Sequence, residues 1–232
     1  MHIDDNTPNG WNAVWKRKDL FISIIDTGRE FYNLFFKRLM ASRLKNNDEM
    51  IELGCGSAST LSLSIAKKLK KYVGIDTSQE ALLIARKITH SKKIMNAEFI
   101  EADIFNLPKN LHNRFDLVWS QGLMEHFPDY LPVVEAHYQV IKPGGTMLLG
   151  VPWKYSYINI WSWATKNKWL ARFWPYAEQK FLTHKELREL GEKIGAPYRA
   201  YIIPPFYIGF ILGVLFLEIK KPHETLTGSL IA

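Results

Sequence analysis

The fold is decided by the stretch Glu52-Leu53-Gly54-Cys55-Gly56-Ser57-Ala58-Ser59, a glycine-rich bend between two different apolar patterns. The residues just before it, 50–53, form a short apolar run that is typical of a buried strand. The residues after it, 60–71, alternate apolar positions with lysines at helical spacing. Glycines at a strand-to-helix bend let the backbone turn tightly and approach a ligand without a Cβ in the way. The stretch therefore predicts a ligand site at the end of a first strand.

The same alternation of strand and helix patterns continues along the rest of the chain. Further strands are predicted at 72–76, 98–102, 115–120, 146–151, 198–203 and 213–220, and helices at 19–44, 77–89, 131–141 and from 183 onward. Capping-box pairs, Thr77 with Glu80 and Thr183 with Glu186, predict two of the helix starts, and a Pro-Gly pair ends helix 131–141. This alternation predicts a parallel sheet covered by helices on both faces. The last two strands are joined by about nine residues, fewer than the dozen or so that a parallel crossover needs, so the final strand is expected to run antiparallel.

Composition indicates an ordinary globular chain in a reducing compartment. The 232 residues are 47% hydrophobic and 23% charged, which fits one domain with a full core. Cys55 is the only cysteine, so no intramolecular disulfide can form. The first residues lack the basic start and apolar run of a signal peptide, and prolines and glycines interrupt the longest uncharged stretch, 200–217. We therefore expect a cytoplasmic protein, and the net charge of +7 allows an anionic partner.

Two aspartates strengthen the prediction of a ligand site after the first strand. Asp76 ends the second predicted strand and Asp103 ends the third, where they could contact ribose hydroxyls and an adenine edge, or simply cap the next turn. A dinucleotide fingerprint would need a third glycine where Ser59 stands. The carboxylate of Glu52 also suits a cationic ligand better than a pyrophosphate. The residues therefore favour S-adenosylmethionine, which carries a sulfonium and an amino group, over a dinucleotide.

The sequence between 50 and 152 resembles the Rossmann-like, class I S-adenosylmethionine-dependent methyltransferases, in particular the small-molecule group called type 11. The resemblance rests on the segments 52–56, Gly-Ile-Asp at 74–76, Glu-Ala-Asp-Ile at 101–104, Phe-Asp-Leu-Val-Trp-Ser at 115–120 and Ile-Lys-Pro-Gly-Gly at 141–145. It implies a three-layer α/β sandwich around a seven-stranded, mostly parallel sheet whose last strand is antiparallel. It also implies that Gly54 and Gly56 line the methionine part of the cofactor, Asp76 holds the ribose, and Asp103 with Ile104 holds the adenine. The candidate cofactor-binding residues are Glu52, Gly54, Cys55, Gly56, Asp76, Thr77, Asp103, Ile104, Ser120 and Gln121. No catalytic role is expected for Cys55, which we interpret as a small residue that faces the interior of the loop.

The segment after the fourth predicted strand, 120–127, carries the candidate catalytic residue. Methyl transfer from a sulfonium is an in-line displacement, so a base is needed only where the acceptor loses a proton. His126 is the candidate base, because an imidazole titrates near neutral pH, although a structural or cofactor-side role is the alternative. Glu125 is interpreted as a surface or helix-start charge. The segment has neither the Asn-Pro-Pro-Tyr pattern of adenine methyltransferases nor an acidic metal cluster, so no metal is predicted.

Two aromatic segments are expected to choose the substrate. The insertion 153–182 holds five of the eight tryptophans together with several basic residues, and the connection 204–212 is uncharged. Both are expected at the carboxyl edge of the sheet, where ligands bind in such folds. Candidate substrate residues are Trp153, Tyr155, Tyr157, Trp161, Phe206 and Tyr207. Three interpretations remain open: a substrate lid, a mouth that meets a membrane or a lipid-like substrate, and a surface that stacks on nucleic-acid bases, which is favoured least.

The sequence thus predicts one methyltransferase domain in four parts. Residues 1–46 form an N-terminal helical cap, 47–152 the cofactor-binding core, 153–182 the aromatic insertion, and 183–222 the last helix with the final two strands. The predicted activity is O-methylation of a small or amphiphilic acceptor, such as a lipid, a quinone-type ring or a lipid-linked sugar. The alternatives are an RNA or protein methyltransferase and a non-catalytic S-adenosylmethionine-binding partner subunit. Peripheral membrane contact is a further expectation, and no pattern in the sequence indicates the oligomeric state.

Overall fold

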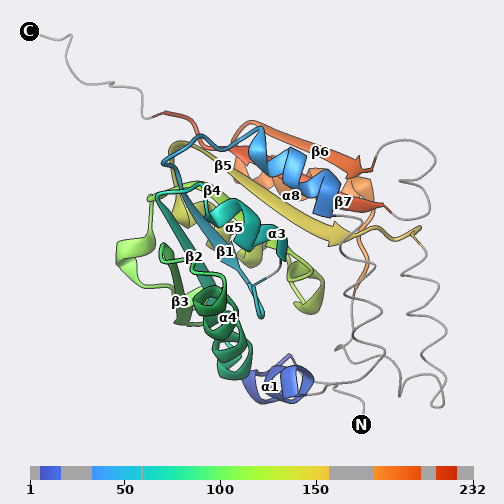
Figure 1. The fold of residues 1–232 in the computed structure, drawn as a ribbon. Helices are drawn as coiled ribbons and strands as arrows, with labels where there is room; N and C mark the ends of the chain where they lie inside the picture. Colours follow the sequence, from blue (N-terminus) through green and yellow to red (C-terminus); the bar gives the residue numbers. More distant parts are fainter. Residues whose placement is uncertain (1–5, 17–32, 59, 157–179, 205–212, 224–232) are drawn as a thin grey trace, which may run out of the picture.

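The computed structural model describes residues 6–16, 33–58, 60–156, 180–204 and 213–223 (Figure 1). Its strands are β1 (Glu49–Leu53), β2 (Lys71–Asp76), β3 (Ala97–Glu101), β4 (Phe115–Gln121), β5 (Ile141–Pro152), β6 (Tyr198–Ile203) and β7 (Val214–Lys220). They form one seven-stranded sheet in the order β3-β2-β1-β4-β5-β7-β6. Neighbouring pairs from β3 to β5 are parallel, whereas β7 is antiparallel to both β5 and β6. The predicted reversal of the last strand is confirmed.

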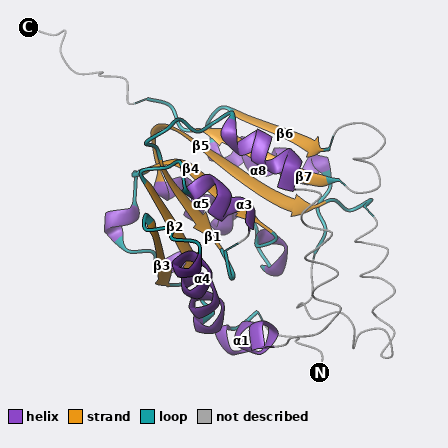
Figure 2. Ribbon diagram, in the orientation of Figure 1, coloured by secondary structure: helices purple, strands orange, loops and turns teal. Residues whose placement is uncertain are grey.

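Helices cover both faces of this sheet (Figure 2). The helices labelled in Figure 1 are α1 (Pro8–Lys16), which lies at the carboxyl ends of the strands, and α3 (Thr60–Ala66), α4 (Gln79–Ser91), α5 (Leu131–Val140) and α8 (His184–Ile194). The 3-10 turns of the described segments are η1 (Ile104–Asn106), η2 (Lys109–Leu111) and η3 (Met124–His126). Apolar side chains of α5 and α8 pack on one face, and those of α3, α4 and the helical segment 33–41 pack on the other. The predicted three-layer α/β sandwich is therefore confirmed for the described residues.

The central strands are buried on both faces, which explains their continuous apolar runs. In β4, Val118 belongs to the cluster under α5 and α8, while its neighbour Trp119 belongs to the cluster under α3 and α4. Both side chains are almost fully buried. Burial of an apolar side chain of this size stabilises a fold by about 1.5–3 kcal/mol. The two clusters hold the strand ends, and hence the loops that follow them, in fixed positions.

Several predicted boundaries were wrong, and the described part of the predicted N-terminal helix ends at residue 41 rather than 44. Helix α3 ends at Ala66 rather than residue 71, because the side-chain amide of Asn96 binds the carbonyls of Ala66 and Leu69, both at 2.7 Å. Helix α4 is capped by Ser78, whose hydroxyl accepts from the N–H of Ala81, and not by Thr77. Strand β5 begins at residue 141 and not 146, since the chain becomes extended directly after α5 and passes through the Pro-Gly pair within the strand.

The start and end of α8 agree with the sequence. Thr183 and Glu186 form the predicted capping box, in which the Thr183 hydroxyl accepts from the Glu186 N–H and the Glu186 carboxylate accepts from the Thr183 N–H. Gly195 follows the helix with φ +73°, a left-handed conformation that glycine adopts without strain. The part of the predicted N-terminal helix from 19 to 32 lies outside the described residues.

Candidate functional site

The parallel strands bring the predicted site residues to one edge of the sheet. Because β1, β2, β3 and β4 are adjacent and parallel, their carboxyl ends lie side by side. The glycine loop follows β1, Asp76 ends β2, Asp103 follows β3, and Gln121 ends β4. Four segments that are far apart in the sequence thus meet where such sheets bind ligands.

Asp76 joins the glycine loop to the start of α4. Its Oδ2 accepts from the Gly56 N–H at 2.7 Å, and its Oδ1 accepts from the Ser78 N–H at 2.8 Å. Burial raises the pKa of this carboxyl group, while the N–H groups of Ser78, Gly56 and Thr77 act in the opposite direction. A carboxylate has about four acceptor positions, so the two oxygens keep capacity for the two hydroxyls of a ribose. The side chain therefore ties the glycine loop to Ser78, the capping residue of α4, and remains suited to a ribose.

The glycine loop is tightly folded over the end of β2. Gly54 and Gly56 have φ of +69° and +53°, a conformation that other residues adopt only with strain. The Cys55 N–H donates to the Ile75 carbonyl at 2.9 Å, which ties the loop to β2. Burial, together with the charges of Asp76 and Glu52, raises the pKa of the Cys55 thiol well above its ordinary value. This thiol is buried and protonated, in agreement with its interpretation as an inert residue facing the loop interior.

Glu52 lies beneath the loop in a polar network that the sequence did not predict. The Tyr72 hydroxyl donates to its Oε2 at 2.5 Å, and both side chains are buried. Burial raises the pKa of Glu52 to about 7, although hydrogen bonds from Tyr72, Ser62 and Trp119 act in the opposite direction. Its carboxyl group therefore faces the protein interior and can act on a cationic ligand only through its charge.

The end of β3 offers an exposed aspartate beside an apolar wall. Asp103 accepts from the Phe105 N–H at 3.0 Å and so caps η1, which was the alternative role considered for it. Ile104 is buried at 6% exposure, whereas Phe105 remains 46% exposed and contacts Phe127 edge-on at 5.4 Å. A flat ring could lie against this wall with Asp103 at its edge, but the cap already uses one Asp103 oxygen.

Helix α1 covers the glycine loop. Figure 1 shows α1 beside the start of α4, where the Asn12 side-chain oxygen accepts from the Ser78 hydroxyl at 2.7 Å and the Glu80 N–H at 3.2 Å. The Trp15 indole packs so closely on Gly56 that a Cβ there would lie 2.5 Å from it. Trp11 contacts the His126 ring edge-on, with centroids 4.9 Å apart. One helix thus touches three parts of the edge: the loop after β1, the start of α4 and the turn after β4.

The turn after β4 places His126 at this edge and Glu125 inside the protein. Glu125 is only 1% exposed, so of its two predicted roles the surface charge was wrong, whereas it does lie in the first turn of η3. The 3-10 turn η3 directs the Glu125 side chain toward Gly122. Nearby, burial raises the pKa of the Tyr130 hydroxyl to about 12, with smaller contributions from the charges of Glu186 and Glu125. His126 is half-buried under Trp11. Neighbouring residues of one short turn therefore have opposite environments, which the sequence pattern did not reveal.

The remaining candidates at the end of β4 and β5 have different environments. Ser120 is buried, so a cofactor contact would come from its backbone, while Gln121 is half-buried. Trp153 is 8% exposed and Tyr155 60% exposed, with their rings edge-to-face at 5.5 Å. Residue 153, just after β5, pairs with Leu182, so the two ends of the segment 153–182 lie side by side. The other substrate candidates, Tyr157, Trp161, Phe206 and Tyr207, lie outside the described residues.

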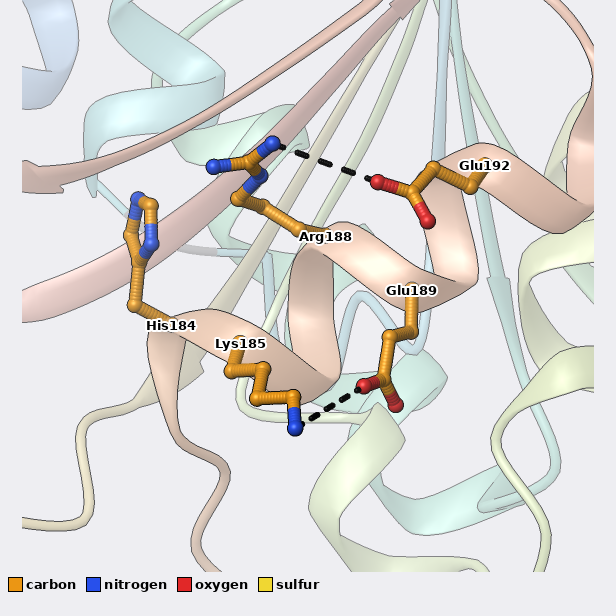
Figure 3. A pocket seen from close by; sticks show the side chains of 5 residues that line it. All are labelled: His184, Lys185, Arg188, Glu189 and Glu192. Atoms are coloured by element: carbon orange, nitrogen blue, oxygen red, sulfur yellow. Dashed lines mark ion pairs between the residues drawn. The ribbon is translucent and has the colours of Figure 1, made fainter.

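A shallow hollow on the outside of α8 is a poor candidate for a second site (Figure 3). It is lined by His184, Lys185, Arg188, Glu189 and Glu192, all from this one helix. Lys185 pairs with Glu189 at 3.8 Å and Arg188 with Glu192 at 4.0 Å. Exposed pairs of this kind are common on solvated helix faces and contribute little to stability. Within the described segments there is neither a cluster of potential metal ligands nor a helix long and apolar enough to cross a membrane.

The strand order, the glycine loop and the aspartate that ends β2 form a Rossmann-like domain, which the family match below assigns to the class I S-adenosylmethionine-dependent type. The chain belongs to the methyltransferase-domain family, whose model matches residues 44–191, well over half of the chain. The cofactor of this class is S-adenosylmethionine. The family and its cofactor agree with the expectations from the sequence.

The chain matches only part of the length of each curated relative, between 40% and 64% of it. The chain is 29% identical over 157 residues to a ubiquinone biosynthesis O-methyltransferase of Pseudoalteromonas translucida, covering 66% of this chain and 64% of that protein. It is 30% identical over 122 residues to a demethylmenaquinone methyltransferase of Staphylococcus saprophyticus, covering 51% of each. It is 28% identical over 97 residues to a ubiquinone biosynthesis O-methyltransferase of Acinetobacter baylyi, covering 42% of this chain and 40% of that protein. The magnesium protoporphyrin IX methyltransferase of Synechocystis PCC 6803 with bound S-adenosylhomocysteine has the same fold, with a TM-score of 0.65, 14% identity, and coverage of 92% and 93%.

Proposed function

We propose that this chain methylates a hydroxyl group of a quinone-type or similarly amphiphilic acceptor. The observation that carries the proposal is that relatives with two different names, ubiquinone biosynthesis O-methyltransferase and demethylmenaquinone methyltransferase, both refer to quinone-type acceptors. The exposed Tyr155 and the aromatic composition of 153–182 support an acceptor with a flat, apolar ring. Oxygen is the proposed acceptor atom, because the longest of these matches is to an O-methyltransferase.

The described residues suit the cofactor at the glycine loop. When bound, S-adenosylmethionine supplies an electrophilic methyl group on a sulfonium. In our proposal Asp76 accepts from the ribose hydroxyls with the oxygen lone pairs that Gly56 and Ser78 leave available. The positive φ of Gly54 and Gly56 lets the loop backbone approach the methionine part. The remaining proposed cofactor contacts are those of the candidate set named from the sequence, with Glu52 acting through its charge.

Two features of the edge would assist the transfer itself. Helix α1, which packs on Gly56 and His126, excludes water from the glycine loop, and exclusion of water strengthens electrostatic interactions at the reacting atoms. His126 is the proposed base, since it lies in the turn that follows β4 and an imidazole can take the proton of an attacking hydroxyl. The edge-on contact with Trp11 restricts the orientation of that ring.

The test is methyl transfer with an unbiased choice of acceptors. Purified protein is incubated with methyl-labelled S-adenosylmethionine and a lipid-containing cell extract, and the products are separated into organic-soluble, aqueous, protein and RNA fractions. We expect label in the organic-soluble fraction, and at least a hundredfold less of it with the Asp76→Asn variant at a subsaturating cofactor concentration. Label in the RNA or protein fraction would replace the proposal with one of the macromolecular activities. No label in any fraction would favour a non-catalytic partner subunit.

We further propose that a lipid-soluble acceptor brings the protein to the membrane surface. Lys154 and Tyr155 are exposed next to each other after β5, which is the combination found at bilayer interfaces. Flotation with anionic vesicles tests this contact, and we expect the protein to float with the vesicles. If the protein stays at the bottom of the gradient, the acceptor must reach it from solution.

A further inference from the structure

A buried histidine contacts the end of β4, the strand that precedes the turn carrying the candidate base. His137 belongs to α5 and is 0% exposed. One ring nitrogen, Nδ1, lies 2.7 Å from the Val133 carbonyl oxygen, and the other, Nε2, lies 2.8 Å from the Ser120 hydroxyl. Ser120 itself is 1% exposed and sits one residue before the end of β4. The contact therefore joins a helix to the strand end that enters the candidate site.

The partners of the two nitrogens determine where the protons are. A carbonyl oxygen can only accept, so Nδ1 carries the proton and donates it to Val133. In a neutral imidazole Nε2 is then an acceptor, so the Ser120 hydroxyl donates to it. Burial lowers the pKa of His137 to about 4, although the bond to Val133 acts in the opposite direction. The ring is therefore neutral at physiological pH, and its buried position does not suit a role in proton transfer.

The Ser120 contact has consequences for the turn that follows it. After Gln121, the Gly122 N–H donates to the Gly150 carbonyl at 3.1 Å, and Leu123 packs on Gly54 of the glycine loop. A shift of the β4 end would therefore move the residues that support the glycine loop as well as η3. Because the Ser120 hydroxyl is buried, water cannot replace the His137 nitrogen as its hydrogen-bond acceptor, and removing that nitrogen leaves the hydroxyl unsatisfied.

We propose that His137 is a positioning residue for this site: by accepting the Ser120 hydroxyl proton it fixes the carboxyl end of β4, and so sets the place of the turn 121–126 against the glycine loop. Its action is indirect, because it reaches the site through the Ser120 hydroxyl and the end of β4. The inference depends on S-adenosylmethionine binding at this edge and is independent of the acceptor's identity. His137 thereby adds to the site a residue that no sequence motif indicates.

The test measures S-adenosylhomocysteine affinity by calorimetry in five variants. His137→Leu keeps an apolar side chain of similar size but removes the acceptor, and we expect Kd to rise about tenfold. His137→Gln keeps an acceptor near the position of Nε2, and Kd is expected within threefold of the parent. Ser120→Ala removes the donor, so adding His137→Leu to it is expected to change Kd by less than twofold. His184→Leu is the matched control, since His184 also contacts a carbonyl, that of Ala200, from the exposed face of α8.

Each outcome decides the inference. An unchanged Kd in His137→Leu overturns it, and so does an equal loss with and without Ser120→Ala, which would indicate packing alone. If His137→Leu does not fold, ¹⁵N NMR of the parent decides: a protonated Nδ1 with an unprotonated Nε2 supports the inference, and the reverse overturns it. If the parent binds S-adenosylhomocysteine but methylates no quinone-type acceptor, the proposed function fails while this inference stands.

Discussion

Replacement of Asp76 probes the link between the glycine loop and the cofactor most sharply. Asp76→Asn keeps one acceptor oxygen, but it puts an amide donor where the Gly56 N–H or the Ser78 N–H must donate. Hydrogen bonds to a charged group contribute about 1.5–3 kcal/mol each, so the loss of a loop contact and of a ribose contact amounts to about 3 kcal/mol or more. At about 1.4 kcal/mol for each factor of ten, Kd for S-adenosylhomocysteine should rise roughly a hundredfold.

The matched control for this variant is Asp116→Asn. Asp116 also accepts a backbone N–H, that of Glu49 at 2.9 Å, and pairs with Lys142, but it lies near the start of β4, at the opposite edge of the sheet. Calorimetry should therefore give Asp116→Asn an affinity within threefold of the parent. If Asp76→Asn binds as well as the parent, or if both variants weaken binding equally, Asp76 does not hold the ribose.

Three further predictions concern the residues around this link. Gly56→Ala should lower the unfolding free energy by about 2 kcal/mol more than Gly195→Ala, since both glycines have positive φ but only Gly56 meets Trp15; equal losses in chemical denaturation would contradict the close packing of α1. Burial raises the pKa of Glu52 from 4.5 to about 7, so the folded state holds its proton more tightly and its contribution to stability is lost as pH rises through 7. Glu52→Gln should therefore remove a fall of roughly 3 kcal/mol in unfolding free energy between pH 4.5 and pH 8, and an unchanged pH profile would refute this. His126→Ala should lower kcat about a hundredfold with S-adenosylhomocysteine affinity within threefold; a kcat within threefold of the parent would assign His126 a structural role.

The sequence was sufficient for the fold because its signals are local and repeated. The strands β1, β2 and β4 are short, largely buried apolar runs, and each has a glycine, aspartate or serine at or just after its carboxyl end. The short connection after β6 predicted the antiparallel β7 from chain length alone. Boundaries failed where distant side chains decide them: Asn96 ends α3, and Asn12 contributes to the start of α4.

The sequence predicted only those site residues that belong to a recognisable sequence motif. Asp76 and the glycine loop meet because adjacent parallel strands must bring them together, and the loop spacing indicates this directly. The burial of Glu125 and the contact of His137 with Ser120 depend on how η3 and α5 pack on β4, which no local pattern encodes. Tyr72 was likewise predicted only as a strand residue, although its hydroxyl binds Glu52.

The most direct test of the central claim uses purified protein, methyl-labelled S-adenosylmethionine and a demethylated hydroxyquinone with a short isoprenoid tail. The account predicts label in the organic-soluble product as a methyl ether, at a rate that falls at least a hundredfold in Asp76→Asn at a subsaturating cofactor concentration. Label that remains entirely in the cofactor, in a parent protein that binds S-adenosylhomocysteine, would contradict the proposed activity.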